Sequence, residues 1–110
     1  MRIKEELDPL ELTMLHASLY PVLGLLMQFC YTHNVPCVIT SLIRSDSSSH
    51  KTGRAVDVSI KGWKEIQIEA FKHMAEVRYG YLGAYSKSDN KQRLVVDHGP
   101  VRHLHLQVKP

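Results

Sequence analysis

The sequence predicts an α+β domain with a small, mainly antiparallel sheet, N-terminal helices and one further helix packed on the sheet. Two observations lead to this fold class. A helical stripe of apolar residues fills the first third of the chain, and short β-branched runs lie on both sides of a second helical segment. With 110 residues, 44% hydrophobic and 23% charged, the chain is expected to form one domain, residues 1–110.

A helix is expected to begin at Asp8. Asp8 is the predicted N-cap, Pro9 takes the first helical position, where no N–H is needed, and Glu11 completes a capping box. Pro21 is expected to kink this helix or divide it in two, and the helix should end near His33–Asn34. Its apolar stripe comprises Leu12, Leu15, Leu19, Val22, Leu23, Leu26, Phe29 and Cys30.

Strands are expected before and after a second helix. The turn residues that separate the periodic segments set the boundaries. Strands are predicted at 35–43, 55–60, 81–85, 93–97 and 102–108, with a polar loop at 44–54 and a turn at 86–92. The second helix is predicted at 63–79, terminated by Gly80, with an apolar face of Trp63, Ile66, Ala70, Met74 and Val77.

Alternation along two predicted strands places polar side chains on one face. Asp57, in strand 55–60, points to the face opposite its β-branched neighbours, and His103 and His105 do the same in strand 102–108. If the two strands are neighbours, Asp57 and His105 can approach one ion. The core face takes Val56, Val58, Ile60, Leu104, Leu106 and Val108.

A third polar residue completes a candidate metal site. His50 lies seven residues before Asp57 in a Ser-rich loop, with Gly53 between them where the backbone must turn. With His105, these residues supply two imidazoles and one carboxylate, which suits a tetrahedral zinc ion with its fourth position open to water. Zinc lowers the pKa of such a water toward ~7 and polarises a carbonyl, as amide hydrolysis requires. Other divalent ions can also occupy this ligand set.

Two segments carry a family resemblance. Ser48–Asp57, "SSHKTGRAVD", matches the pattern Ser-x-His-x-x-Gly-x-Ala-x-Asp, and His103–Gln107, "HLHLQ", matches a C-terminal His-x-His. The chain thereby resembles the zinc D-Ala-D-Ala carboxypeptidases and L-alanyl-D-glutamate endopeptidases (peptidase family M15 of the LAS metallopeptidases), including phage endolysins. Ser41–Arg44 is similar to the Ser-x-x-Arg element of that group. The resemblance implies a Hedgehog/DD-peptidase-like fold with a zinc site on the sheet, one zinc ion and the ligands His50, Asp57 and His105.

The resemblance also implies roles for residues around the metal. Arg44 would hold a substrate carboxylate or carbonyl, Ser48 would support the loop and the substrate, and His103 would act on the attacking water or the oxyanion. Members of the group that end in Glu-x-x-His use glutamate as the general base, but the last glutamate here is Glu76. The candidates for the base are therefore His103, Asp97 and His98.

The function implied is hydrolysis of a peptide bond in peptidoglycan stem peptides, of the D,D-carboxypeptidase or L-Ala-D-Glu endopeptidase type, by a phage- or wall-lysis enzyme. The alternative is a non-catalytic zinc-containing module of the same fold that acts in wall binding or interaction. The bond that is cut and the host remain open. The chain is expected to act as a monomer on peptidoglycan peptides.

Charge and composition bear on location and partners. The net charge of +3 suits an anionic partner such as a cell-wall polymer, nucleic acid or a membrane surface, but the basic residues are spread along the chain, so ordinary solubility charge is an equally good interpretation. No motif indicates nucleic-acid binding. No signal peptide is recognised and segment 12–38 is too polar to insert in a membrane, so the chain is expected to be made in the cytoplasm and to reach the wall by release or delivery. Cys30 and Cys37 are interpreted as small core residues, and a single bridge between them is left open.

Overall fold

The computed structural model describes residues 1–42, 52–86, 89–99 and 101–110. A five-stranded mixed sheet has the strand order β1-β2-β3-β7-β6, and β4 and β5 form a separate two-stranded sheet. The strands are β1 (Arg2–Ile3), β2 (Val38–Ser41), β3 (Ala55–Ser59), β4 (Ala84–Tyr85), β5 (Gln92–Arg93), β6 (Val95–His98) and β7 (His103–Gln107). The helices are α1 (Leu19–His33), α3 (Glu65–Tyr79) and the 3-10 helices η1 (Pro9–Met14) and η2 (Gly80–Leu82).

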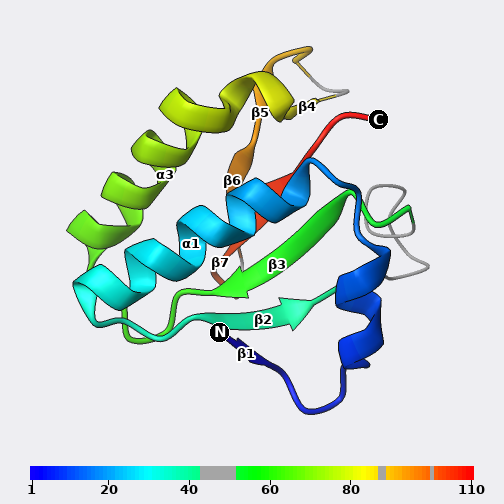
Figure 1. The fold of residues 1–110 in the computed structure, drawn as a ribbon. Helices are drawn as coiled ribbons and strands as arrows, with labels where there is room; N and C mark the ends of the chain where they lie inside the picture. Colours follow the sequence, from blue (N-terminus) through cyan, green and yellow to red (C-terminus); the bar gives the residue numbers. More distant parts are fainter. Residues whose placement is uncertain (43–51, 87–88, 100) are drawn as a thin grey trace.

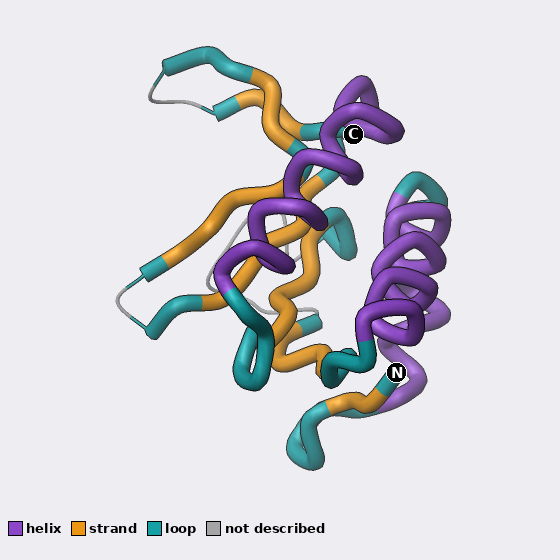
Figure 2. Tube along the Cα trace, turned by 90° about the vertical axis from the view of Figure 1, so that its left-hand side faces the viewer, coloured by secondary structure: helices purple, strands orange, loops and turns teal. Residues whose placement is uncertain are grey.

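The helices cover one face of the sheet. Helix α1 lies across that face, and α3 packs beside α1 and against β6 (Figure 1; Figure 2 shows the same layers from the side). The core lies between the two helices and the apolar face of β3 and β7, where the predicted inward residues are buried. These layers confirm the predicted α+β class.

Within the described ranges, no helix has the length and apolar character needed to cross a membrane.

An aromatic cluster joins the two helices. The Phe29 ring of α1 lies 5.5 Å from the Trp63 ring and 5.4 Å from the Phe71 ring of α3, centroid to centroid. The Trp63 indole Nε1 donates a hydrogen bond to the Pro36 carbonyl oxygen at 2.9 Å. Because a buried indole N–H needs an acceptor, this bond fixes the chain before α3 against the turn that precedes β2.

The sheet is mixed rather than purely antiparallel because of its first strand. Strand β1 pairs in parallel with β2, and the Arg2 N–H donates to the Cys37 carbonyl oxygen at 2.7 Å. The β2–β3, β3–β7 and β7–β6 pairings are antiparallel. A strand of two residues has no readable alternation, so β1 was not predicted.

The expected first helix is two separate helices. Asp8 caps η1 as predicted, because its side chain accepts from the Leu10 N–H at 3.0 Å, but η1 ends at Met14. The chain is then extended at Leu15, and α1 begins at Leu19. Pro21 falls in the first turn of α1, where its missing N–H costs no intrahelical bond, so the break precedes the proline.

The predicted apolar face of the second helix is wrong at Ile66, Ala70 and Val77, whereas Trp63 is buried and Met74 packs against the core, as predicted. Helix α3 begins at Glu65, and Ile66 and Val77 are 76% and 73% exposed. Phe71 is fully buried instead. A buried aromatic ring removes more apolar surface from water than the competing side chains, so it sets the rotation of the helix about its axis. The observed buried face is Ile68, Phe71 and Ala75.

The predicted strand 93–97 belongs to two sheets. Strand β5 ends at Arg93 and β6 begins at Val95, with Leu94 fully buried between them. One carboxylate oxygen of Glu76 accepts the backbone N–H of Leu94 at 2.6 Å and that of Val95 at 2.7 Å. Helix α3 therefore supplies the acceptor for two N–H groups at this junction.

Candidate functional site

Adjacent strands bring two of the predicted metal ligands together. Asp57 of β3 is the register partner of His105 of β7, and Ser59 is the partner of His103 in the same antiparallel ladder. Because residues two apart in a strand share a face, Asp57, His103 and His105 all lie on the face opposite the helices. The convergence expected from the alternation is confirmed for Asp57 and His105.

The three side chains form a compact polar cluster. The Asp57 Oδ1 lies 2.9 Å from the His105 Nδ1 and 3.6 Å from the His103 Nε2. Asp57 is 4% exposed and His105 is 9% exposed, whereas His103 is half-buried. A buried carboxylate is costly unless it is hydrogen-bonded or binds a cation, so this cluster is a candidate site on physical grounds alone.

The orientation of His103 is set by the turn before β7. Its Nδ1 lies 2.9 Å from the Val101 carbonyl oxygen, and a carbonyl can only accept, so Nδ1 carries the hydrogen. In the neutral ring the lone pair is then on Nε2, the nitrogen that faces Asp57. The backbone of the turn thereby selects the tautomer.

A groove opens beside this cluster. Its volume is about 440 Å³, and it is lined by residues of β2, β3 and β7, by the β6–β7 turn and by Lys4, which follows β1. Two basic side chains, Lys4 and Arg102, lie on its wall. The lining residues are Lys4, Thr40, Ser41, Asp57, Ser59, Gly99, Val101, Arg102 and His103.

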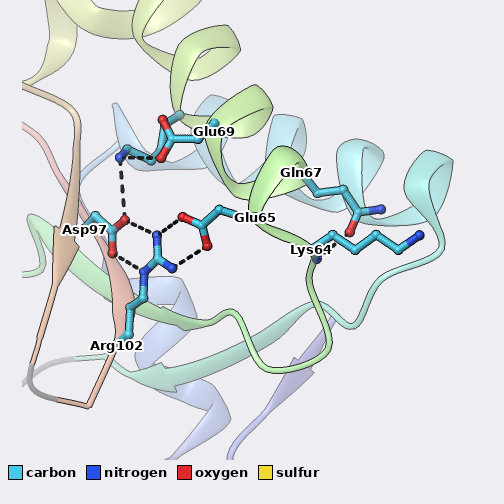
Figure 3. Close-up of polar contacts among 7 residues, drawn as sticks. Lys64, Glu65, Gln67, Glu69, Asp97 and Arg102 are labelled. Carbon is cyan, nitrogen blue, oxygen red and sulfur yellow. Dashed lines mark hydrogen bonds and ion pairs between the residues drawn. The ribbon is translucent and has the colours of Figure 1, made fainter.

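Arg102 ties the rim of the groove to α3. Its guanidinium makes two hydrogen bonds to Asp97 at 2.9 and 2.7 Å and two to Glu65 at 2.6 and 2.7 Å (Figure 3). The Lys72 Nζ lies 3.5 Å from the Asp97 carboxylate. Hydrogen bonding to Arg102 lowers the pKa of Asp97 and of Glu65, and both carboxylates raise the pKa of Arg102.

Sequence reasoning missed Arg102 because its partners come from two other elements. Glu65 is the first residue of α3 and Asp97 lies in β6, 37 and 5 residues away from Arg102 in the chain. Lys4 was missed because the N-terminal segment carried no predicted element. A basic residue next to the His-x-His segment was the one available signal for Arg102.

The third predicted ligand, His50, belongs to the loop between β2 and β3. His50, Ser48 and Arg44 lie outside the described residues. The side chain of His98 is also outside them. The roles predicted for these residues stay predictions. Gly53 is described, and its φ of +71° confirms the turn expected there. In residues 1–42, 52–86, 89–99 and 101–110, no three His, Cys, Asp or Glu side chains are grouped so as to hold a metal ion.

The two described donor atoms are compatible with a shared metal ion. Zinc bonds of ~2.0–2.1 Å at a tetrahedral angle place two ligand atoms about 3.3 Å apart. The Asp57 Oδ1 and the His105 Nδ1 are 2.9 Å apart, so a movement of about 0.4 Å would reach that spacing. In the described geometry the contact is a hydrogen bond from the imidazole N–H to the carboxylate. The pair therefore suits either shared ligation or a carboxylate that orients a ligating histidine.

The chain was compared with protein-family models, curated proteins and solved structures, and none of them matches it.

Proposed function

We propose that the chain is a zinc-dependent peptidase that hydrolyses a peptide bond in peptidoglycan stem peptides, as a D,D-carboxypeptidase or an L-Ala-D-Glu endopeptidase of phage or wall lysis. The observation that carries the proposal is the buried contact between Asp57 and His105 on neighbouring strands. In the sequence, Asp57 is the last residue of the Ser48–Asp57 motif and His105 is the last residue of the His-x-His motif. The resemblance assigns both residues to one zinc ion. His50 would be the third ligand.

When bound, zinc supplies Lewis acidity for the scissile carbonyl and activation of the attacking water. Asp57 and His105 would hold the ion, and the remaining described groups would act around it. His103 would accept and return a proton at Nε2, because the Val101 carbonyl holds the hydrogen on Nδ1. Asp97 is a weaker candidate for the base, because its carboxylate is held by Arg102 and its pKa is lowered.

The groove is suited to a peptide with anionic groups. It opens at the cluster, and Lys4 lies on its wall near Arg102, whose guanidinium is already bound to Asp97 and Glu65. Stem peptides carry carboxylates at D-Glu and at the terminal D-Ala, and the Lys4 ammonium at the groove wall favours such groups. Arg44, as predicted from the sequence, would add a second guanidinium on the substrate side.

Hydrolysis of isolated peptidoglycan tests the proposal. The purified chain, loaded with one equivalent of zinc, is expected to release new amino groups, and mass spectrometry of the muropeptides identifies the bond. His50→Ala and His105→Ala should lose zinc and activity together, whereas His73→Ala, at an exposed position of α3, should keep both.

Each outcome of this experiment is interpretable. A chain that retains stoichiometric zinc but releases no amino groups from peptidoglycan would be the non-catalytic zinc module of the alternative. A chain that neither retains zinc nor hydrolyses peptidoglycan would exclude both functions. Release of amino groups by His50→Ala at the wild-type rate would remove His50 from the site.

A further inference from the structure

A second chemically active pair lies at the other end of β2. Cys30 is in the last turn of α1, and Cys37 directly precedes β2, with six residues between them. Both are free thiols. The left-handed Asn34 at the end of α1 reverses the chain, and the Val35 N–H donates to the Cys30 carbonyl oxygen at 3.0 Å. The turn thus returns Cys37 to the helix end that carries Cys30.

The two sulfur atoms are in contact and their surroundings differ. The Cys30 thiol hydrogen-bonds to the Cys37 sulfur, and its Sγ also lies 3.7 Å from the Pro36 carbonyl oxygen. This hydrogen bond lowers the pKa of Cys37, whereas the interaction with Cys37 and burial raise the pKa of Cys30. Cys30 is buried at a helix C-terminus, which disfavours a thiolate, so the negative charge belongs on Cys37.

Reagents can reach the pair from solvent. A surface pocket of about 320 Å³ is lined by both cysteines and by Met27, Tyr31 and Asn34, among others. Tyr31 and Met27 are themselves exposed. Cys37 is half-buried at this pocket, so it is the thiol that an incoming molecule meets first.

We propose that Cys30 and Cys37 form a thiol–disulfide exchange site that a small disulfide, such as oxidised glutathione, converts to an intramolecular disulfide. The Cys37 thiolate attacks one sulfur of the reagent, forming a mixed disulfide and expelling one glutathione thiolate. Cys30 then loses its proton and attacks the Cys37 sulfur, expelling the second thiolate. The two cysteines lose two electrons together, and the reagent gains them as it is reduced to two thiols.

The Cys30–Cys37 disulfide would link the last turn of α1 covalently to the residue before β2. Strand β2 pairs with β1 on one side and with β3, which carries Asp57, on the other. The bond would form between residues that the fold already holds in contact, so the sheet should keep its register. This site uses none of the residues assigned to the proposed peptidase, and the two proposals stand or fall separately.

The test is equilibration of the reduced, purified chain with defined ratios of reduced and oxidised glutathione. The acid-quenched chain is expected to lose the mass of its two thiol hydrogens, and peptide mapping should locate the bond at Cys30–Cys37. In the folded state the equilibrium constant for this bond should exceed that of the urea-unfolded chain by about tenfold or more, because the fold holds the sulfurs together. Equal constants, or disulfides only between chains, would overturn the proposal.

Single variants assign the two roles. Cys30→Ser should stop at the mixed disulfide on Cys37, and Cys37→Ser should form glutathione adducts at least about tenfold more slowly, because Cys30 is buried. Circular dichroism checks that each variant is folded. If Cys30→Ser does not fold, the comparison of wild type with Cys37→Ser still decides the matter, since equally fast adduct formation in that variant would show that Cys37 is not the attacking thiol.

Discussion

A His103→Ala variant is expected to keep its zinc and to lose most of its peptidase activity. A positioned general acid–base contributes about 10²–10⁴-fold to the rate, which corresponds to about 3–5 kcal/mol of transition-state stabilisation. The reason for zinc retention is geometric. The Asp57–His105 contact of 2.9 Å does not involve His103, whose Nε2 is 3.6 Å from the same carboxylate oxygen.

The fold should tolerate this substitution. The His103 ring is half-buried and lies at the groove, so its removal enlarges the groove rather than leaving a closed cavity. The free energy of unfolding should change by no more than about 1 kcal/mol. The matched control is His73→Ala, which removes an exposed imidazole from α3.

Three measurements on the same samples test the reasoning. Amino-group release from peptidoglycan reports the rate, metal analysis reports zinc content, and added imidazole should restore part of the lost rate, because it can carry the proton. Full activity in His103→Ala would show that His103 is not the catalytic group. Loss of zinc together with activity would instead make His103 a ligand.

Four further predictions concern stability. Glu76→Ala removes the acceptor of two backbone N–H groups and should cost about 2–4 kcal/mol, which corresponds to a fall of roughly 10–25 °C in the thermal midpoint. Glu76→Gln should largely avoid this fall, and equal falls in the two variants would refute this account. Gly53→Ala should destabilise by about 1–3 kcal/mol, since its φ is +71° and a Cβ would lie 2.6 Å from the Met14 carbonyl oxygen. Gly24→Ala, in α1 with no atom outside its own helix within 4 Å of the added Cβ, should stabilise by about 0.5–1 kcal/mol. A lower thermal midpoint in Gly24→Ala, or an unchanged or higher one in Gly53→Ala, would contradict the corresponding expectation. The two carboxylates bound to Arg102 have lowered pKa values in the folded chain. Their contribution to the free energy of unfolding is therefore present above the unfolded pKa of ~4 and is lost as pH falls through the folded pKa values. In urea unfolding, the stability of Arg102→Met should depend less on pH below about 4 than that of the wild type.

The part of the site that was predictable from sequence depends on strand geometry. Side chains alternate strictly along a strand, so the positions of Asp57 and of His105 within their runs fixed the face each would take. The pairing of β3 with β7, which the prediction took only as a condition, places them opposite each other. The orientation of His103 was not predictable, because it depends on a carbonyl in the turn before β7.

Helical segments were less predictable, for a different reason in each. Along α3, the set with Ile66 and Val77 and the set with Ile68 and Phe71 both follow the helical period, so periodicity alone does not show which set is buried. The packing of the Phe71 ring against Phe29 and Trp63 decides which of the two faces is buried. In the N-terminal segment the stripe was continuous in sequence, yet the chain is extended at Leu15 between η1 and α1.

By itself, the sequence determined the class of the fold, the alternating faces of β3 and β7 and two members of the candidate metal site. The tertiary structure alone decided the parallel β1, the rotation of α3, the contact between Cys30 and Cys37, and the attachment of Arg102 to both Glu65 and Asp97. The physical reason is the separation along the sequence of the residues that interact. Alternation and helical spacing arise from the geometry of neighbouring residues, whereas these contacts join segments that only the folded chain brings together.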